Sequence, residues 1–160
     1  RWNDKLATID DLCRRVFTTT FAFMAKEEPS ELFTAKATLV VNLSLSNDEE
    51  VHRLNKEFRN MDKPTNVLSF ANVDDPDFEE ELANADDFLE LGDIIIALET
   101  LEREALEQSI SLQDQLSHLL VHGVLHLLGY DHQEDEEAEH MEGLEIKILQ
   151  HLNIKNPYEE

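Results

Sequence analysis

The sequence predicts an α+β fold, in which helices cover a small mixed β-sheet. Segments with helical periodicity are interspersed with short β-branched segments, and neither a βαβ unit nor any other repeat recurs. No linker rich in Pro, Gly or Ser divides the 160 residues, and Gly and Pro number four each. We therefore expect a single domain over residues 1–160, long enough to bury a core without disulfides.

Five segments have the apolar spacing of helices. Thr8 is placed to cap the helix expected at 8–26. Asn47 or Ser46 is placed to cap the helix expected at 48–60, whose first turn is acidic, as the helix dipole favours. Gly129 follows the very apolar segment 112–128, at the position where a left-handed glycine ends a helix. We expect the segment 99–110 to be an exposed, charged helix. The five segments are residues 8–26, 48–60, 99–110, 112–128 and 134–152.

Three segments are rich in β-branched and alternating apolar residues, which predicts strands at 36–46, 65–73 and 91–98. Between the last two, residues 74–90 carry nine acidic residues and no basic one. We expect this stretch to be a solvated, mobile insertion that is disordered or partly helical.

The charge balance is strongly acidic, with 13 Lys and Arg against 36 Asp and Glu, a net charge of −23. Such a chain is unsuited to coating nucleic acid or an anionic membrane nonspecifically. No apolar run is long enough to span a membrane. The single cysteine, Cys13, excludes an internal disulfide framework and fits a reducing compartment. To bind a phosphate-polymer substrate, the chain would need a local feature that outweighs the repulsion from its net negative charge.

Residues 118–132, HLLVHGVLHLLGYDH, contain that feature. His122 and His126 are four apart on a helix and therefore lie on one face, about 6 Å apart along the axis. The chain turns at Gly129 and can deliver His132 as a third ligand. Three neutral imidazoles leave one position of a tetrahedral zinc ion open, the pattern of a catalytic site, although a histidine pair on an apolar helix is often structural. We predict one Zn²⁺ per chain at the end of this central helix.

For each of two neighbouring residues, the pattern leaves two roles open. His118 lies one turn before His122 and cannot share an ion with His126, so we expect it to pack near the site or hydrogen-bond to a ligand. Asp131 is equally suited to accept a hydrogen bond from a ligand imidazole or to cap the turn. The remaining histidines stand in polar surroundings and are expected at the surface; they are His52, His140 and His151.

Gly123 stands where a zinc protease of the H-E-x-x-H type has its glutamate base, so that chemistry is disfavoured. A glycine inside a helix costs roughly 1 kcal/mol, which indicates a packing or access reason for it. A second feature is a basic strip between residues 53 and 63. It is either a solvated helix end or a phosphate-binding surface. Its members are Arg53, Lys56, Arg59 and Lys63.

With these residues in view, the chain resembles the YbeY family of bacterial endoribonucleases. Residues 122–132 match its signature H-G-x-L-H-L-x-G-Y-D-H throughout. Residues 55–70, NKEFRNMDKPTNVLSF, nearly reproduce its pattern N-x-x-F-R-x-x-D-x-x-T-D-V-L-S-F, and L-G-D-I begins at Leu91. Asn66 stands where the family usually has Asp and Ala71 where it has Pro; we assign Asn66 no role. The family's usual first strand is not found before residue 8.

The resemblance implies three histidine ligands for a metal, usually zinc, with Arg59 as the catalytic or phosphate-binding arginine. It also implies metal-dependent cleavage of single-stranded RNA. We expect action on ribosomal RNA, at the 3′ end of the small-subunit species, and in ribosome quality control in the bacterial cytoplasm. The expected partners are ribosomal RNA, the small ribosomal subunit and a ribosomal protein, with no DNA and no membrane.

Two other functions compete with this one. A ribosome-assembly factor with a structural metal would suit the acidic surface but not an open ligand position. A hydrolase of small phosphates or amides would suit the metal but leave the basic strip without a use. The residues do not distinguish attack by water from attack by the ribose 2′-hydroxyl, and they reveal no general base.

Overall fold

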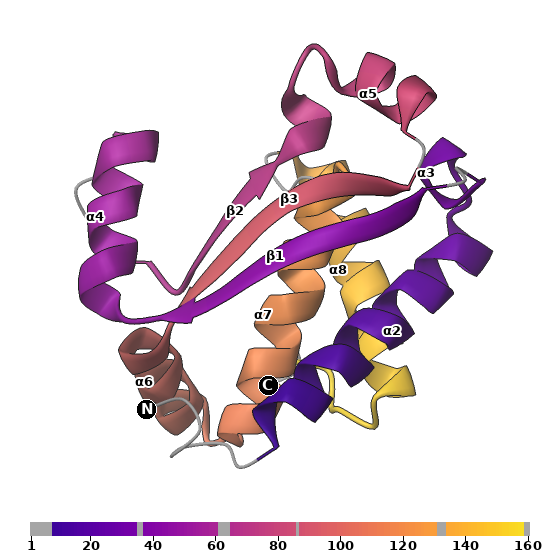
Figure 1. Cartoon of the computed structure of the whole chain (residues 1–160). Coiled ribbons are helices and arrows are strands. Elements are labelled where there is room, and N and C mark those ends of the chain that lie inside the picture. Colours follow the sequence, from indigo (N-terminus) through magenta and orange to yellow (C-terminus); the bar gives the residue numbers. More distant parts are fainter. Residues whose placement is uncertain (1–7, 35–36, 61–64, 86, 131–133, 159–160) are drawn as a thin grey trace.

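The computed structural model describes residues 8–34, 37–60, 65–85, 87–130 and 134–158. Its sheet has three strands in the order β1-β3-β2 (Figure 1). β1 (Thr38–Ser46) pairs parallel with β3 (Phe88–Ala97), and β2 (Val67–Ala71) pairs antiparallel with it. The predicted α+β class and small mixed sheet are confirmed.

The boundaries of two strands differ from the prediction. β3 begins at Phe88 rather than at residue 91, because Thr38 of β1 pairs with Phe88 in the parallel ladder. β2 ends at Ala71, and a short 3-10 helix η1 (Asn72–Asp74) follows it. Both differences arise from pairing and turning that the local residue pattern does not specify.

Gly92 is required by the close approach of two strands. It has a φ of 140°, and a Cβ there would collide with the carbonyl oxygen of Phe70 on β2. The ladder between β1 and β3 is also irregular between Val40 and Val41, so β3 has an additional residue at this level. Glycine is therefore the residue that fits this part of the central strand.

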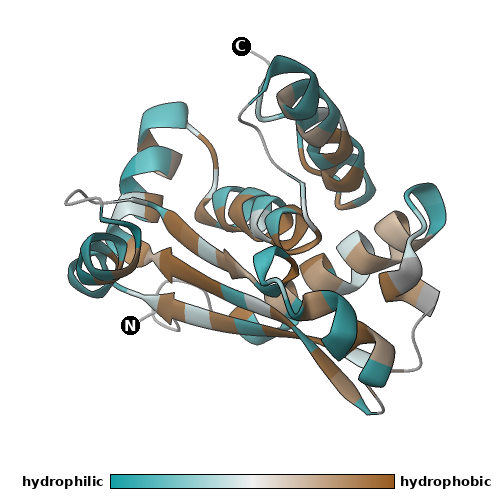
Figure 2. Ribbon diagram, turned by 90° about the horizontal axis from the view of Figure 1, so that it is seen from above, coloured by the Kyte–Doolittle hydropathy of each residue, from teal (hydrophilic) through white to brown (hydrophobic). Residues whose placement is uncertain are grey.

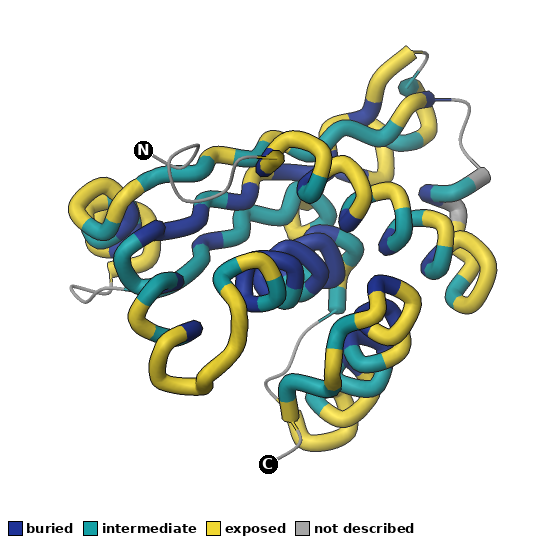
Figure 3. Tube along the Cα trace, turned by 90° about the horizontal axis from the view of Figure 1, so that it is seen from below, coloured by how far each residue is buried: buried dark blue, intermediate teal, exposed yellow. Residues whose placement is uncertain are grey.

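Three long helices pack on one side of the sheet, as Figure 1 shows. They are α2 (Ile9–Glu27), α7 (Leu112–Leu127) and α8 (Asp135–His151). α7 is central and contacts both of the other helices. It is buried along most of its length (Figure 3), and hydrophobic residues dominate the strands it packs against (Figure 2). Burial of apolar surface from every layer drives this packing.

The predicted long helices are confirmed to within about a turn, and their caps follow the expected chemistry. The side chain of Asn47, rather than Ser46, caps α4 (Asp48–Arg59) by accepting from the Glu50 amide at 2.8 Å. Thr8 stands at the start of α2, but its side chain makes no capping hydrogen bond. Gly129 follows α7 with a φ of 101°, as predicted.

The acidic stretch 74–90 is partly helical. Within it lies α5 (Phe78–Asn84), and its last three residues belong to β3. Phe78 is 6% exposed and joins the main hydrophobic cluster. A four-residue helix, α3 (Glu31–Thr34), precedes β1.

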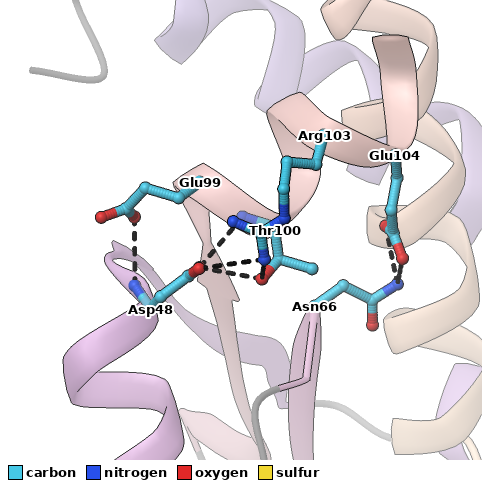
Figure 4. Close-up of polar contacts among 6 residues, drawn as sticks. All are labelled: Asp48, Asn66, Glu99, Thr100, Arg103 and Glu104. Carbon is cyan, nitrogen blue, oxygen red and sulfur yellow. Dashed lines mark hydrogen bonds and ion pairs between the residues drawn. The ribbon is translucent and has the colours of Figure 1, made fainter. Parts of the chain in front are cut away.

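α6 (Leu98–Gln108) is less exposed than the sequence predicts, since Leu98, Leu101 and Ala105 are buried. Its first turn and that of α4 cap each other (Figure 4). Asp48 accepts from the amide of Thr100 at 2.9 Å, while Glu99 accepts from the amide of Asp48 at 3.1 Å. Arg103 also pairs with Asp48 at 3.2 Å. Each helix therefore supplies an acceptor for the amide groups left unpaired at the other's start.

Candidate functional site

The two histidines predicted on α7 meet in the structure. The Nε2 atoms of His122 and His126 lie 3.0 Å apart. The Ser111 side chain caps the start of α7, because its hydroxyl accepts from the Asp114 amide at 3.0 Å. The turns that follow are largely buried. Only the face with the two imidazoles is partly exposed; the side chain of His122 is 23% exposed.

The outer nitrogens of both rings are engaged as donors. His126 Nδ1 lies 3.0 Å from the carbonyl oxygen of Tyr130, which can only accept. His122 Nδ1 lies 2.5 Å from a carboxylate oxygen of Glu145. If both rings are neutral, the two Nε2 lone pairs point at each other. A cation between them, or a proton on one ring, is needed to relieve that repulsion.

This donor set fits a zinc ion. Two nitrogens bound tetrahedrally to one zinc at about 2.0–2.1 Å lie about 3.3 Å apart, close to the separation seen here. Fixing of Nδ1 by a carboxylate and a carbonyl is also the usual arrangement around zinc-binding histidines. His122 and His126 are therefore suited to hold a metal through Nε2.

The predicted third ligand, His132, and its neighbour Asp131 lie outside the described residues. Within the described part of the chain, no three His, Cys, Asp or Glu residues gather closely enough to hold a metal. The turn toward His132 is formed as far as Tyr130, whose amide donates to the Leu125 carbonyl at 3.0 Å. The three-histidine metal site thus remains a prediction.

Gly123 has the packing reason that its helical position suggested. A Cβ on this residue would lie 2.9 Å from Cδ1 of Ile94 on β3. The turn of α7 that carries His122 therefore approaches the sheet more closely than any other residue type would permit without movement.

Glu145 on α8 is the site residue that the sequence analysis missed. Its carboxylate is completely buried. Burial by itself would raise the pKa of Glu145, but the nearby His118, hydrogen bonds from His122 and Tyr158, and the charge of His122 lower it to about 2. The sequence signal for a functional Glu145 is an acidic residue among the apolar positions of a helix, beside Leu144 and Ile148.

His118 belongs to the same cluster. Its Nε2 lies 3.3 Å from the Tyr158 hydroxyl and 3.8 Å from Glu145 Oε2. It contacts the groups around His122 rather than the point where the Nε2 atoms of His122 and His126 meet. Of the other described histidines, His140 and His151 are exposed, as predicted, and His52 is half-buried on α4. His140 pairs with Glu28 at 2.6 Å, and His151 packs on Phe23.

Arg59, the last residue of α4, is held against β2. Its guanidinium donates to the Ser69 carbonyl oxygen and lies 4.8 Å from the centroid of the Phe70 ring. β2 is an edge strand of the described sheet and contacts both α4 and α7. The arginine and the histidine pair thus stand on helices that share one strand.

The other described members of the basic strip are exposed on α4, the helix that ends at Arg59. Arg53 forms an exposed ion pair with Glu57 at 3.1 Å, which stabilises the helix only slightly. Lys56 is exposed on α4. Lys63 lies outside the described residues. Arg59 is therefore the member with a defined position on the sheet.

Comparison with known proteins gives a consistent result. The family model described as Endoribonuclease YbeY matches residues 3–153. A relative from Sphingopyxis alaskensis with that name is 47% identical over 158 residues, 98% of this chain and 91% of the relative. Another, from Francisella tularensis subsp. novicida, is 52% identical over 118 residues, 74% of this chain and 70% of the relative.

A solved structure is also similar in fold. The solution structure of a Thermotoga maritima protein matches with a TM-score of 0.54 and 24% identity, covering 94% of this chain and 93% of the other. No described helix has the length and apolarity needed to cross a membrane.

Proposed function

The chain belongs to the Endoribonuclease YbeY family and so has a role as a hydrolase of RNA; from this premise we propose that it is a zinc-dependent enzyme that cleaves single-stranded ribosomal RNA. The proposed substrate is the 3′ end of the small-subunit species. We further propose that it acts in ribosome quality control in the bacterial cytoplasm, together with the small subunit and a ribosomal protein.

The paired histidines are the observation that carries the proposal. His122 and His126 direct Nε2 atoms 3.0 Å apart toward one point while each Nδ1 donates elsewhere. His132 is proposed as the third ligand. When bound, zinc lowers the pKa of a coordinated water and polarises a phosphoryl oxygen.

Arg59 is proposed to bind the scissile phosphate. Guanidinium has five N–H donors, so a bond to the Ser69 carbonyl leaves others for phosphate oxygens. The ring of Phe70 and the Ser69 carbonyl hold the group in place before substrate arrives. Such preorganised donors stabilise the charge that develops on a phosphoryl group in the transition state.

The net charge of −23 shapes how RNA is bound. Phosphate contacts at the Arg59 site are opposed by the acidic surroundings, so we propose weak binding to naked RNA, with a Kd above about 1 μM at physiological salt. Presentation of the strand on a ribosomal particle would then supply the specificity. Tight, salt-insensitive binding to naked RNA would contradict this part of the proposal.

Single-turnover cleavage of a single-stranded RNA by the zinc-loaded protein tests the function. We expect Arg59→Ala to lower the rate by about 10²–10³-fold, as loss of a preorganised donor does, and His126→Ala to lower both zinc content and rate. The matched controls are Arg14→Ala and His151→Ala, two exposed positions on α2 and α8. Cleavage at the native rate by both site variants would overturn the proposal.

A further inference from the structure

Glu145 is an anomaly of the α8 core. The helix buries Met141, Leu144, Ile148 and Leu149, and the carboxylate of Glu145 is as inaccessible as they are. An ionised carboxylate in such surroundings is costly unless its oxygens are fully hydrogen-bonded. A leucine at this position would pack without that cost, so the carboxylate calls for an explanation beyond core packing.

Both oxygens of Glu145 have a defined partner. Oε1 lies 2.5 Å from Nδ1 of His122 on α7, a helix that packs beside α8 (Figure 1). Oε2 accepts from the hydroxyl of Tyr158 at 2.5 Å. Tyr158 follows α8 and is 44% exposed, so it covers the carboxylate from the outside. With Oε2 held by Tyr158, Oε1 is directed at His122.

This geometry determines which nitrogen of His122 carries its proton. A carboxylate can only accept, so Nδ1 is the donor and Nε2 presents its lone pair to the point shared with His126. We infer that Glu145 is a positioning residue, which fixes the ring orientation and tautomer of His122 so that Nε2 is available to a metal ion. This inference rests on the proposed function, since it takes His122 as a metal ligand.

The substitution Glu145→Gln tests the inference by zinc affinity. The amide has nearly the same shape, but it can turn its N–H₂ group toward His122 and so favour the tautomer with the proton on Nε2. We expect zinc to bind about 10–100-fold more weakly, measured by competition with a chromophoric chelator. The matched control is Glu139→Gln, an exposed acid on the same helix, for which we expect unchanged affinity. Equal affinity in native protein and Glu145→Gln would overturn the inference.

A measurement on the native protein does not depend on how the variant folds. Long-range ¹H–¹⁵N spectra of the metal-free native protein at pH 8 should show His122 protonated at Nδ1. An unprotonated Nδ1 would overturn the inference, whatever the variants do.

The two proposals fail in distinguishable ways. Native protein that binds zinc but does not cleave RNA would contradict the proposed function and leave the role of Glu145 supported by affinity and tautomer. Native protein that cleaves RNA, with a Glu145→Gln variant that retains full zinc affinity, would contradict the inference alone.

Discussion

Gly123 on α7 and Ile94 on β3 are in direct contact, with Cδ1 of Ile94 2.9 Å from the place that a Cβ of residue 123 would take. Ile94 is completely buried and has little room to withdraw. This contact sets the distance between the sheet and the turn of α7 that carries His122. Packing against Ile94 thus explains why residue 123, next to His122, is a glycine.

Gly123→Ala is expected to destabilise the protein by up to about 2 kcal/mol, because overpacking a tight core costs about 1–3 kcal/mol and alanine gains only about 1 kcal/mol over glycine in a helix. The measurement is the free energy of unfolding in urea. Gly143→Ala is the matched control: this helical glycine has no atom within 4 Å of its virtual Cβ, so alanine should stabilise by about 0.5–1 kcal/mol. Stabilisation of similar size at both positions would refute the packing explanation.

Asn66 has a structural partner that depends on its being an amide. Its Nδ2 donates to both oxygens of Glu104 on α6, at 3.0 and 3.1 Å (Figure 4). Glu104 also accepts from Gln115 on α7 at 3.1 Å. The amide therefore connects the start of β2 to two helices.

Asn66→Asp would place two carboxylates in contact and should lower the free energy of unfolding at pH 7 by about 1–2 kcal/mol. Like charges raise the folded-state carboxyl pKa, so the folded state binds more protons and the loss should shrink as the pH falls toward 4. Adding Glu104→Gln should restore most of the stability, because the new amide can donate to Asp. A double-mutant cycle by urea unfolding measures this, and simple additivity of the two changes would contradict it.

Cys13 offers a test of burial away from the site. Desolvation, together with the negative charge of Asp10, raises the pKa of its thiol to about 11. At pH 8 roughly one thiol in a thousand is then ionised, and the thiolate is the reactive form. We expect thiol–disulfide exchange between Cys13 and an aromatic disulfide reagent to be at least about a hundredfold slower in the native state than in urea, measured by release of the aromatic thiolate.

The same pKa shift predicts a stability change at high pH. A thiol whose pKa is raised by folding contributes stability that is present below about pH 9 and lost as the pH rises toward 11. The Cys13→Ser variant lacks this contribution and serves as the control. Equal rates of exchange with the disulfide reagent in native and unfolded protein would show that the thiol is not protected.

The helix ends and the histidine pair are predictable from the sequence, because residues close together in the chain specify them. The α7 histidine pair follows from four-residue spacing on one helix, and the ends of α4 and α7 follow from Asn47 and Gly129. Such signals are local, so one sequence suffices to recognise them.

Three features are not predictable from the sequence, because they depend on contacts between segments far apart in the chain. Glu145 acquires its role only because α8 packs beside α7 and brings it to His122. Likewise, the first residues of β3 follow an acidic run and become a strand only by pairing with β1. The partner of Asn66 is also on another element, 38 residues along the chain, so local sequence does not reveal its structural role. Tertiary packing decides all three.

The strand order has a consequence for the growing chain on the ribosome. β1 and β2 are both synthesised before β3, yet each pairs only with β3 among the described strands. Neither can satisfy its backbone groups in this sheet until Ala97 has emerged, and the parallel pair must also close a long loop. The apolar faces of both early strands therefore await one late segment. During that interval, native pairing within this sheet cannot protect them from aggregation.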